Sequence, residues 1–327
     1  MGRSVIVRSE SFPLARPFAI SRGVKTAADV VVVKISDGET SGHAECVPYP
    51  RYDETVDGVI AEIEAVVPAL EAGADRDAIN ATMSAGAARN AVDCALWDFE
   101  AKATGTRVAE LSGVGGLKPE ITAETIGIGT ADEMGARAAE LNAAPLLKIK
   151  LDAKDVRKRL DAIREGAPNA RLIIDPNEGW TVDFIAENGT YLADIGVEML
   201  EQPVPAGADA GLRDLDCPVP ICADESLHTS ADLPALKGLY DMVNIKLDKT
   251  GGLTEALNLK RQAIDMGFEI MVGCMVGTSL AMAPAVLVAQ GAKIVDLDGP
   301  LLLKEDRENG IDFTDGLIRP ASSALWG

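Results

Sequence analysis

The sequence predicts a (β/α)₈ barrel joined to a smaller N-terminal α+β domain. After residue 120, short apolar runs recur every 22 to 28 residues, the length of one strand, one helix and two loops. Most of these runs end on an ionisable or polar residue. The residues at the eight expected strand ends are Thr125, Lys150, Asp175, Glu201, Asp224, Lys246, Cys274 and Asp296. Because the carboxyl ends of barrel strands meet at one mouth, we expect these side chains to surround one pocket.

The first part of the chain, residues 1–112, does not follow this repeat. Runs rich in β-branched residues predict strands at 5–11 and 30–35, and Ser36-Asp37-Gly38-Glu39 predicts a hairpin that returns as a strand over 41–47. Apolar periodicity predicts three helices, over 53–71, 75–84 and 86–104. We therefore expect a separate α+β capping domain over 1–112.

The barrel domain is expected over 113–300, after a glycine-rich join at 112–119. The tail, 301–327, is expected to hold a short strand pair around Asp315-Gly316 and to pack back on the capping domain. One stretch, 270–292, carries no charge and is long enough to span a bilayer. Its glycines, Pro284 and its place in the repeat instead predict a buried strand followed by a buried helix.

Composition excludes several classes of partner. The net charge of -20 argues against binding of nucleic acid or of an anionic membrane, since both require basic patches. Five cysteines, odd in number and without CxxC spacing, favour a reducing, cytoplasmic compartment. The N-terminal MGRSVIVRSE has no apolar core of a secretory signal. The sequence leaves open whether the chain forms a homo-oligomer.

Three expected strand ends carry the carboxylates of Asp175, Glu201 and Asp224. Any one of them alone could cap a helix, but three in register on consecutive strands favour an all-oxygen metal site. Such ligands suit Mg²⁺ first, with Mn²⁺ as a substitute. Because the chain has only two histidines, an imidazole-based zinc site is not expected.

Two lysines, Lys150 and Lys246, flank these carboxylates from the second and sixth strands. A lysine can act as a base only when its amine is neutral, and a metal ion together with Lys148 would lower its pKa. A metal-bound substrate carboxylate would acidify the neighbouring C–H, because charge would develop on its oxygens. Removal of that proton on one face and its return on the other predicts inversion of the carbon.

Strand alternation extends the predicted site. Side chains two residues apart on a strand point the same way, so Lys148 should share the mouth with Lys150. The same rule predicts that Asn244 and Asp248 face the mouth with Lys246. Ile149, Ile245 and Leu297 should then point to the surrounding helices.

Five motifs in this order resemble the muconate-lactonising-enzyme-like subgroup of the enolase superfamily. They are KIK (148–150), DPN (175–177), EQP (201–203), ADES (223–226) and NIKLDKTGG (244–252). The resemblance covers essentially the whole chain, including the capping domain. A sixth motif, DLDGP (296–300), resembles the signature of dipeptide epimerases, whose best-known member interconverts L-Ala-D-Glu and L-Ala-L-Glu.

The resemblance implies a Mg²⁺-dependent isomerase that epimerises a dipeptide. One of Lys150 and Lys246 would remove the α-proton, a metal-stabilised enediolate would form, and the other lysine would deliver a proton to the opposite face. It also implies that Asp296 and Asp298 hold the dipeptide's α-ammonium, and two adjacent acids on one side agree with a cation site. The further implied substrate contacts are Thr125 and Lys148 near the carboxylate, Cys274 and Val276 in the pocket wall, and Arg22 beside an acidic side chain.

Other functions remain open from the sequence. The same subgroup includes N-succinylamino acid racemases, o-succinylbenzoate synthases and cycloisomerases, whose substrates offer no cation for Asp296 and Asp298. A non-catalytic dipeptide-binding protein would not need both lysines. A Schiff-base aldolase would use one lysine covalently and would not need three metal-binding acids.

Overall fold

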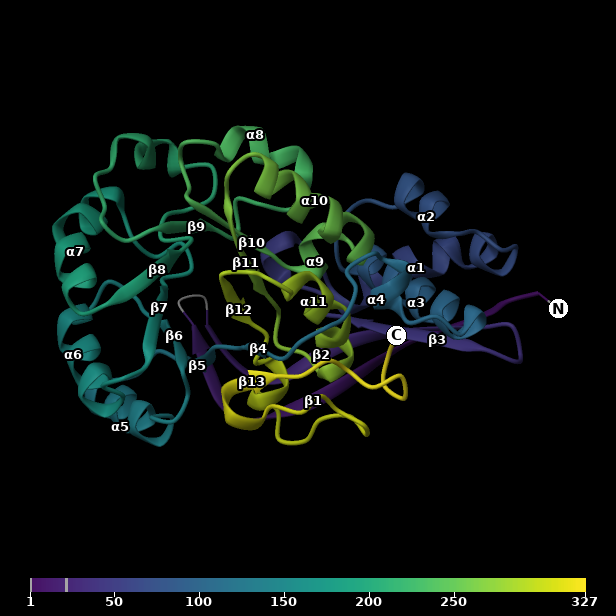
Figure 1. The fold of residues 1–327 in the computed structure, drawn as a ribbon, viewed down its shortest axis with the longest axis horizontal. Coiled ribbons are helices and arrows are strands. Elements are labelled where there is room, and N and C mark those ends of the chain that lie inside the picture. The colour runs from purple at the N-terminus through teal and green to yellow at the C-terminus, as the bar shows by residue number, and fades with distance from the viewer. Residues whose placement is uncertain (1, 21–22) are drawn as a thin grey trace.

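The larger part of the molecule is built around a sheet of eight parallel strands. The structure is a computed structural model that describes residues 2–20 and 23–327. The strands are paired in chain order, and the (β/α)₈ prediction is confirmed (Figure 1). Ala123 donates to the Val295 carbonyl (2.8 Å), and Leu297 donates to Thr122 Oγ1 (2.9 Å), so the two edges of the sheet meet in a nearly closed barrel. The strands are β5 (Glu124–Ile126), β6 (Leu146–Lys150), β7 (Arg171–Asp175), β8 (Val197–Glu201), β9 (Ile221–Ala223), β10 (Met242–Ile245), β11 (Glu269–Gly273) and β12 (Ile294–Asp296).

Helices surround the barrel and bury the outward side chains of its strands (Figure 1). They are α5 (Ala131–Glu140), α6 (Val156–Gly166), α7 (Val182–Asp194), α8 (Leu233–Leu236), α9 (Leu247–Thr250), α10 (Leu253–Asp265) and α11 (Ser279–Ala289). Ile149, Ile245 and Leu297 belong to this layer between strands and helices, as predicted. A separate inner cluster fills the barrel, with one apolar residue from or beside each strand. The barrel is therefore packed inside, and the polar side chains gather at its mouth.

The N-terminal cap has an antiparallel sheet covered by helices. Its strands are β1 (Ser4–Ile20), β2 (Gly23–Ser36) and β3 (Ser41–Cys46), and its helices are α1 (Val56–Glu71), α2 (Arg76–Thr82), α3 (Ala87–Thr104) and α4 (Val108–Leu111). The predicted helices are found within a few residues of their expected bounds. β1 and β2 are much longer than predicted, because their hairpin continues past an irregularity between Pro13 and Phe18 towards the barrel mouth.

The C-terminal tail returns along the cap and the start of the barrel. The strand pair predicted within it is wrong: β13 (Leu317–Ile318) pairs with β4 (Glu120–Ile121), which precedes the barrel. The turn at Asp315-Gly316 is present, but the strand that follows it has its partner almost 200 residues earlier. Trp326 Nε1 donates to the Cys94 carbonyl (3.1 Å) and the Gly327 amide to Asp98 Oδ1 (2.7 Å), so the end of the chain lies against α3.

The uncharged stretch 270–292 divides into most of β11 and the whole of α11, as predicted. All residues of α11 are buried, which accounts for its lack of charge. Within the described residues, no helix has both the length and the apolarity needed to cross a bilayer.

Candidate active site

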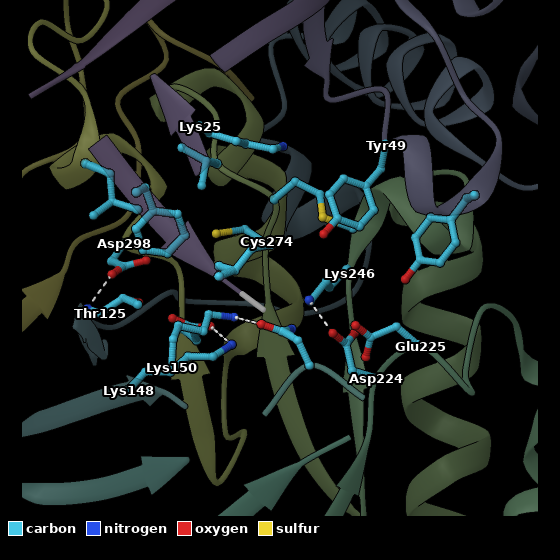
Figure 2. A pocket seen from close by; sticks show the side chains of 18 residues that line it. Lys25, Tyr49, Thr125, Lys148, Lys150, Asp224, Glu225, Lys246, Cys274 and Asp298 are labelled. Atoms are coloured by element: carbon cyan, nitrogen blue, oxygen red, sulfur yellow. Dashed lines mark hydrogen bonds and ion pairs between the residues drawn. The ribbon is translucent and has the colours of Figure 1, made fainter. Parts of the chain in front are cut away.

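A pocket opens at the carboxyl ends of the barrel strands and is closed from above by the cap. It encloses about 670 Å³, part of it open to solvent. Side chains from the β1–β2 hairpin and from the segment after β3 form its roof: Phe18, Ile20, Lys25, Tyr49 and Tyr52. Figure 2 shows Lys25 and Tyr49 on the cap side, with the lysines and acids of the barrel below them.

The two lysines predicted to be catalytic reach this pocket from different sides of the barrel (Figure 2). Lys150 is the last residue of β6, and Lys246 directly follows β10. β7, β8 and β9 lie between these strands, so the lysines flank the strands that carry the three acids. Both side chains are largely buried, with relative exposures of 9% and 7%. Their ammonium groups can therefore reach a pocket ligand from two directions.

The three predicted metal ligands occupy neighbouring strand ends and are fully buried. Asp175 ends β7 and Glu201 ends β8, whereas Asp224 lies one residue beyond β9. Each carboxylate is paired with lysine. Lys150 Nζ lies 2.5 Å from Asp175 Oδ2, and Lys246 Nζ lies 2.6 Å from Asp224 Oδ2. Lys148 Nζ lies 2.6 Å from Glu201 Oε2 and 3.1 Å from Asp175 Oδ2, which places a positive charge between the first two acids.

The carboxylates are thus not gathered into a ready cluster. In the described part of the chain, no three Asp, Glu, His or Cys side chains lie close enough together to hold a metal ion. The donor set nevertheless fits a hard divalent cation, because the acids offer only buried carboxylate oxygens. Six carboxylates at the mouth, Asp175, Glu201, Asp224, Glu225, Asp296 and Asp298, face the ammonium groups of Lys148, Lys150, Lys246 and Lys249. With Lys25 of the pocket roof counted as well, six carboxylates face five ammonium groups, so the mouth keeps a net negative charge when all are ionised, which favours a bound cation.

The charges of these protein groups perturb one another strongly. Burial opposes ionisation of Asp175, but Lys150 and Lys148 outweigh it and lower its pKa to about 2. Burial and the nearby Asp175 raise the pKa of Glu201 to about 7. Burial also disfavours the Lys246 ammonium, yet Asp224 and Glu201 raise its pKa well above the usual value. Without a bound cation, Lys246 is therefore held as the ammonium.

Asp296 and Asp298 line the pocket beside Thr125, as predicted. Asp296 ends β12 and pairs with Lys148 Nζ at 2.7 Å. Asp298 Oδ2 accepts a hydrogen bond from the Thr125 amide at 2.7 Å. Burial and the neighbouring Asp296 raise the pKa of Asp298 to about 7. The two acids therefore form a buried acidic wall, and a cationic group beside it would stabilise the ionised form of Asp298.

The remaining predicted residues have different outcomes. Cys274 and Val276 line the pocket wall beyond β11. Lys148 also lines the pocket, although three carboxylates hold its ammonium. Arg22 lies outside the described residues. The prediction for Asp248 is wrong: β10 ends at Ile245, so Asp248 lies in α9 and accepts hydrogen bonds from the Val47 amide (3.0 Å) and from Asn90 Nδ2 (2.8 Å), both in the cap.

Two buried residues of the site, Lys249 and Gln202, were missed by the sequence reasoning, whereas Asn244 was predicted to face the mouth. Lys249 Nζ lies 2.6 Å from Asp224 Oδ1 and 2.5 Å from the Asp224 carbonyl. Asn244 Nδ2 donates to Glu201 Oε1 at 2.9 Å. Gln202 accepts hydrogen bonds from the backbone near Asp224. Asn244 follows from strand alternation, but Lys249 and Gln202 act on an acid in a loop, which no periodic pattern indicates.

Comparison with known proteins identifies the family of both parts of the chain. Residues 2–113 match the N-terminal domain of the mandelate racemase / muconate lactonizing enzyme family, and residues 130–322 match the enolase C-terminal domain-like family. The chain is 48% identical over 316 residues to the L-Ala-D/L-Glu epimerase of Escherichia coli (strain K12), covering 96% of this chain and 98% of that protein. It is 46% identical over 300 residues to the N-acetyl-D-glutamate racemase of Pseudoalteromonas sp, covering 91% and 95%.

Solved structures give the same result. An enolase family member from Agrobacterium tumefaciens with homology to dipeptide epimerases, with bound sodium and L-Ala-L-Glu, has a TM-score of 0.98 and 53% identity, covering 99% of this chain and 100% of that chain. The dipeptide epimerase from Cytophaga hutchinsonii, complexed with Mg and D-Ala-L-Val, has a TM-score of 0.91 and 28% identity, covering 99% and 95%. Family, fold and the metal chemistry of relatives agree with the predictions from sequence. The chain belongs to the mandelate racemase / muconate lactonizing enzyme group of the enolase superfamily.

Proposed function

We propose that this chain is a Mg²⁺-dependent dipeptide epimerase that inverts the α-carbon of the C-terminal residue, with L-Ala-D-Glu and L-Ala-L-Glu as the interconverted pair. One observation carries the proposal: Lys150 and Lys246 enter one pocket from strands that flank three buried acids. Two ammonium or amine groups on different sides of one carbon are what inversion by proton exchange requires. The 48% identity to the L-Ala-D/L-Glu epimerase of Escherichia coli supports the same substrate.

The polarity of the pocket supports a dipeptide with a free amino group and an acidic side chain. Asp296 Oδ1 is buried and accepts no hydrogen bond from any described residue, so it can accept one from a substrate ammonium. Asp298 lies beside it at the same end of the pocket. On the cap side, Lys25 Nζ lies 5.0 Å from the centroid of the Tyr49 ring and offers a positive charge for a second-residue carboxylate.

We assign the metal to Asp175, Glu201 and Asp224, and the proton transfers to the two lysines. When bound, Mg²⁺ would neutralise charge on the substrate carboxylate and, by taking over Asp224 and Glu201, would remove the pairing that raises the pKa of Lys246. One lysine, as the neutral amine, takes the α-proton and becomes an ammonium. The other, already an ammonium, donates its proton to the opposite face. Exchange of both ammonium groups with water returns the site to either starting state.

A second candidate, racemisation of an N-acylated amino acid, is favoured by the 46% identity to the N-acetyl-D-glutamate racemase of Pseudoalteromonas sp. Such a substrate has no ammonium group, and Asp296 and Asp298 would then be buried beside an uncharged acyl group. An acyl group offers no donor with positive charge to Asp296 Oδ1, which accepts no hydrogen bond from any described residue, so the dipeptide is the better fit.

Exchange of the substrate α-proton with deuterium tests the proposal. The protein, loaded with Mg²⁺ in D₂O, is incubated with L-Ala-L-Glu, L-Ala-L-Lys, L-Ala-L-Leu and N-acetyl-L-Glu, and exchange is followed by NMR. We expect fastest exchange and epimerisation with L-Ala-L-Glu. Exchange with N-acetyl-L-Glu alone would favour the second candidate, and no exchange with any dipeptide would refute the first.

We extend the proposal to the source of the substrate, the cellular compartment and the roles of the two domains. We propose dipeptides from murein as the source of the substrate, and the cytoplasm as the location. All five cysteines are free in the structure, which supports a reducing compartment. We also propose that residues 1–112, with the tail 301–327 against them, act as a cap that selects the substrate, and that residues 113–300 carry the metal and the lysines.

A further inference from the structure

Gln202, the middle residue of the EQP motif, is completely buried and does not line the pocket. It directly follows Glu201, yet its side chain points towards the next strand end rather than into the site. We propose that Gln202 is a positioning residue that fixes the backbone of Asp224 and thereby sets the affinity of the site for Mg²⁺. The inference rests on the proposed function only in that Asp175, Glu201 and Asp224 are taken to bind the ion.

The side-chain amide of Gln202 is held in one orientation by hydrogen bonds at both of its polar atoms. Oε1 accepts from the backbone amides of Asp224 (2.8 Å) and Ser226 (3.0 Å). Nε2 lies within hydrogen-bonding distance of three oxygens, the Val204 carbonyl (3.0 Å), Ser226 Oγ (2.9 Å) and Tyr240 OH (2.9 Å). Only a group that both accepts and donates can satisfy these neighbours, so neither a carboxylate nor an apolar side chain replaces it.

Asp224 needs this support because the sheet does not provide it. Asp175 is paired with Lys150 in the ladder, and Glu201 is paired with Cys222. The ladders of β9 end at Cys222 on one side and at Ala223 on the other, so Asp224 lies beyond them. Its amide is bound by Gln202 and its carbonyl by Lys249, at 2.8 and 2.5 Å. At the third ligand, hydrogen bonds from side chains thus hold the backbone that ladder hydrogen bonds would hold within a strand.

The backbone at Gln202 has an unusual conformation that the surrounding contacts maintain. Its φ of +34° lies in the left-handed region, which a residue with a side chain seldom adopts. The backbone amide of Gln202 donates to the Cys222 carbonyl (2.8 Å). The backbone carbonyl of Gln202 accepts from the amide of Glu178 (2.9 Å), a residue that also has positive φ. These contacts tie the loops after β7, β8 and β9 together at one residue. Such conformations persist where neighbouring structure enforces them, and they concentrate at functional sites.

Gln290 provides a matched control within the same chain. Its side chain also binds a backbone amide and a backbone carbonyl, both of Lys118, at 2.8 and 3.1 Å. It follows α11 and precedes β12, so it lies at the end of the barrel opposite the mouth. Replacing either glutamine by leucine removes hydrogen bonds to a backbone amide and a backbone carbonyl, but only Gln202 is connected to a metal ligand.

The decisive experiment measures Mg²⁺ binding by titration calorimetry, without substrate, in wild type, Gln202→Leu and Gln290→Leu. Outer partners of metal ligands typically affect affinity by one to two orders of magnitude, so we expect Gln202→Leu to raise the Kd for Mg²⁺ roughly 10- to 100-fold. Gln290→Leu should leave this Kd within about twofold. Equal Kd values in wild type and Gln202→Leu would overturn the inference.

Two further measurements cover the case in which Gln202→Leu does not fold. Tyr240→Phe removes one neighbour of Gln202 Nε2 and leaves the amide in place, and we expect it to raise the Kd for Mg²⁺ about threefold. In the metal-free proteins, hydrogen exchange of a peptide covering 221–228 should be faster in Tyr240→Phe than in wild type, with the rest of the barrel unchanged. Unchanged Kd and unchanged exchange in this variant would refute the role assigned to Gln202.

Failure of this inference can be told apart from failure of the proposed function. If wild type binds Mg²⁺ and epimerises L-Ala-L-Glu while both variants keep its Kd, only the positioning role is wrong. If wild type binds Mg²⁺ and exchanges no dipeptide proton, the proposed substrate is wrong, and weaker binding in Gln202→Leu still supports the positioning role.

Discussion

At the β6–β7 side of the mouth, Lys150 and Asp175 are strand residues that face each other as partners in the ladder. At the β9–β10 side, Asp224 and Lys246 both lie just beyond the ends of their strands. The first pair is therefore placed by the sheet itself. The second pair is placed by side chains, since Gln202 and Lys249 hold Asp224 where the ladder has ended.

The cap also contacts the β10 side and the β5 side of the mouth in different ways. On the β10 side, Asp248 accepts from Val47 and Asn90, and Arg89 donates to the carbonyls of Thr250 (2.6 Å) and Gly251 (3.0 Å). These bonds are buried. On the β5 side, the tip of β1 meets the barrel through a backbone hydrogen bond from Ile128 to Ala19 (3.1 Å) and the exposed Arg16–Glu140 pair. Residues remote from the pocket should therefore matter more for Lys246 than for Lys150.

The largest effect is expected when the lysine of each side is removed separately. Lys150→Ala and Lys246→Ala should each lower epimerisation of L-Ala-L-Glu by about 1000-fold or more, because each lysine serves one face. Deuterium exchange should survive with one epimer in the first variant and with the other epimer in the second. Lys293→Ala, which removes an exposed lysine paired with Glu269, is the control and should match wild type. Exchange with the same epimer in both variants would contradict the opposed arrangement.

The cap contacts of the two sides should differ in their contribution to stability. Asp248→Ala leaves the buried Val47 amide and Asn90 Nδ2 without their acceptor, and we expect the free energy of unfolding to fall by about 2 kcal/mol. Arg16→Ala removes an exposed ion pair on the other side and should change it by less than about 0.5 kcal/mol. Urea unfolding followed by circular dichroism measures both, and equal losses would mean that the cap is held evenly.

Asp298, which lies beyond β12, should give a pH dependence of roughly tenfold. With a pKa of about 7, Asp298 is mostly ionised at pH 8 and mostly protonated at pH 6. A protonated carboxyl cannot pair with a substrate ammonium, so kcat/KM at saturating Mg²⁺ should fall about tenfold as the pH is lowered across this range. Asp298→Asn should have a low kcat/KM that varies little between pH 6 and 8. If this variant keeps the wild-type pH profile, another group titrates.

The sequence predicted those site residues whose positions are fixed by a barrel strand. Lys150, Asp175 and Glu201 each end a strand, and the regular repeat locates strand ends without knowledge of the loops. Lys246 and Asp224 were found because each lies one residue beyond such an end. Gln202 and Lys249 were missed because their function depends on how a loop bends back to meet them. Asp248 was misplaced for the same reason, since nothing in KLDKTGG indicates that the strand stops before Lys246 and a helix begins directly after it.

The smallest predicted effect concerns the few contacts between the tip of β1 and the β5 side of the barrel. A Cβ on Gly127 would lie 3.2 Å from the Ala19 carbonyl oxygen and 3.7 Å from Phe18, so Gly127→Ala should displace the tip of β1 by a few tenths of an ångström. Phe18 and Ile20 belong to the pocket roof, whereas both lysines belong to the barrel. We therefore expect KM for L-Ala-L-Glu to rise about threefold with kcat within about twofold. Gly116→Ala is the matched control, because its Cβ would meet no atom within 4 Å, and it should change neither constant. A fall in kcat with unchanged KM would instead show that the tip of β1 helps to place the reacting groups, and that the two sides of the mouth are less independent than their contacts suggest.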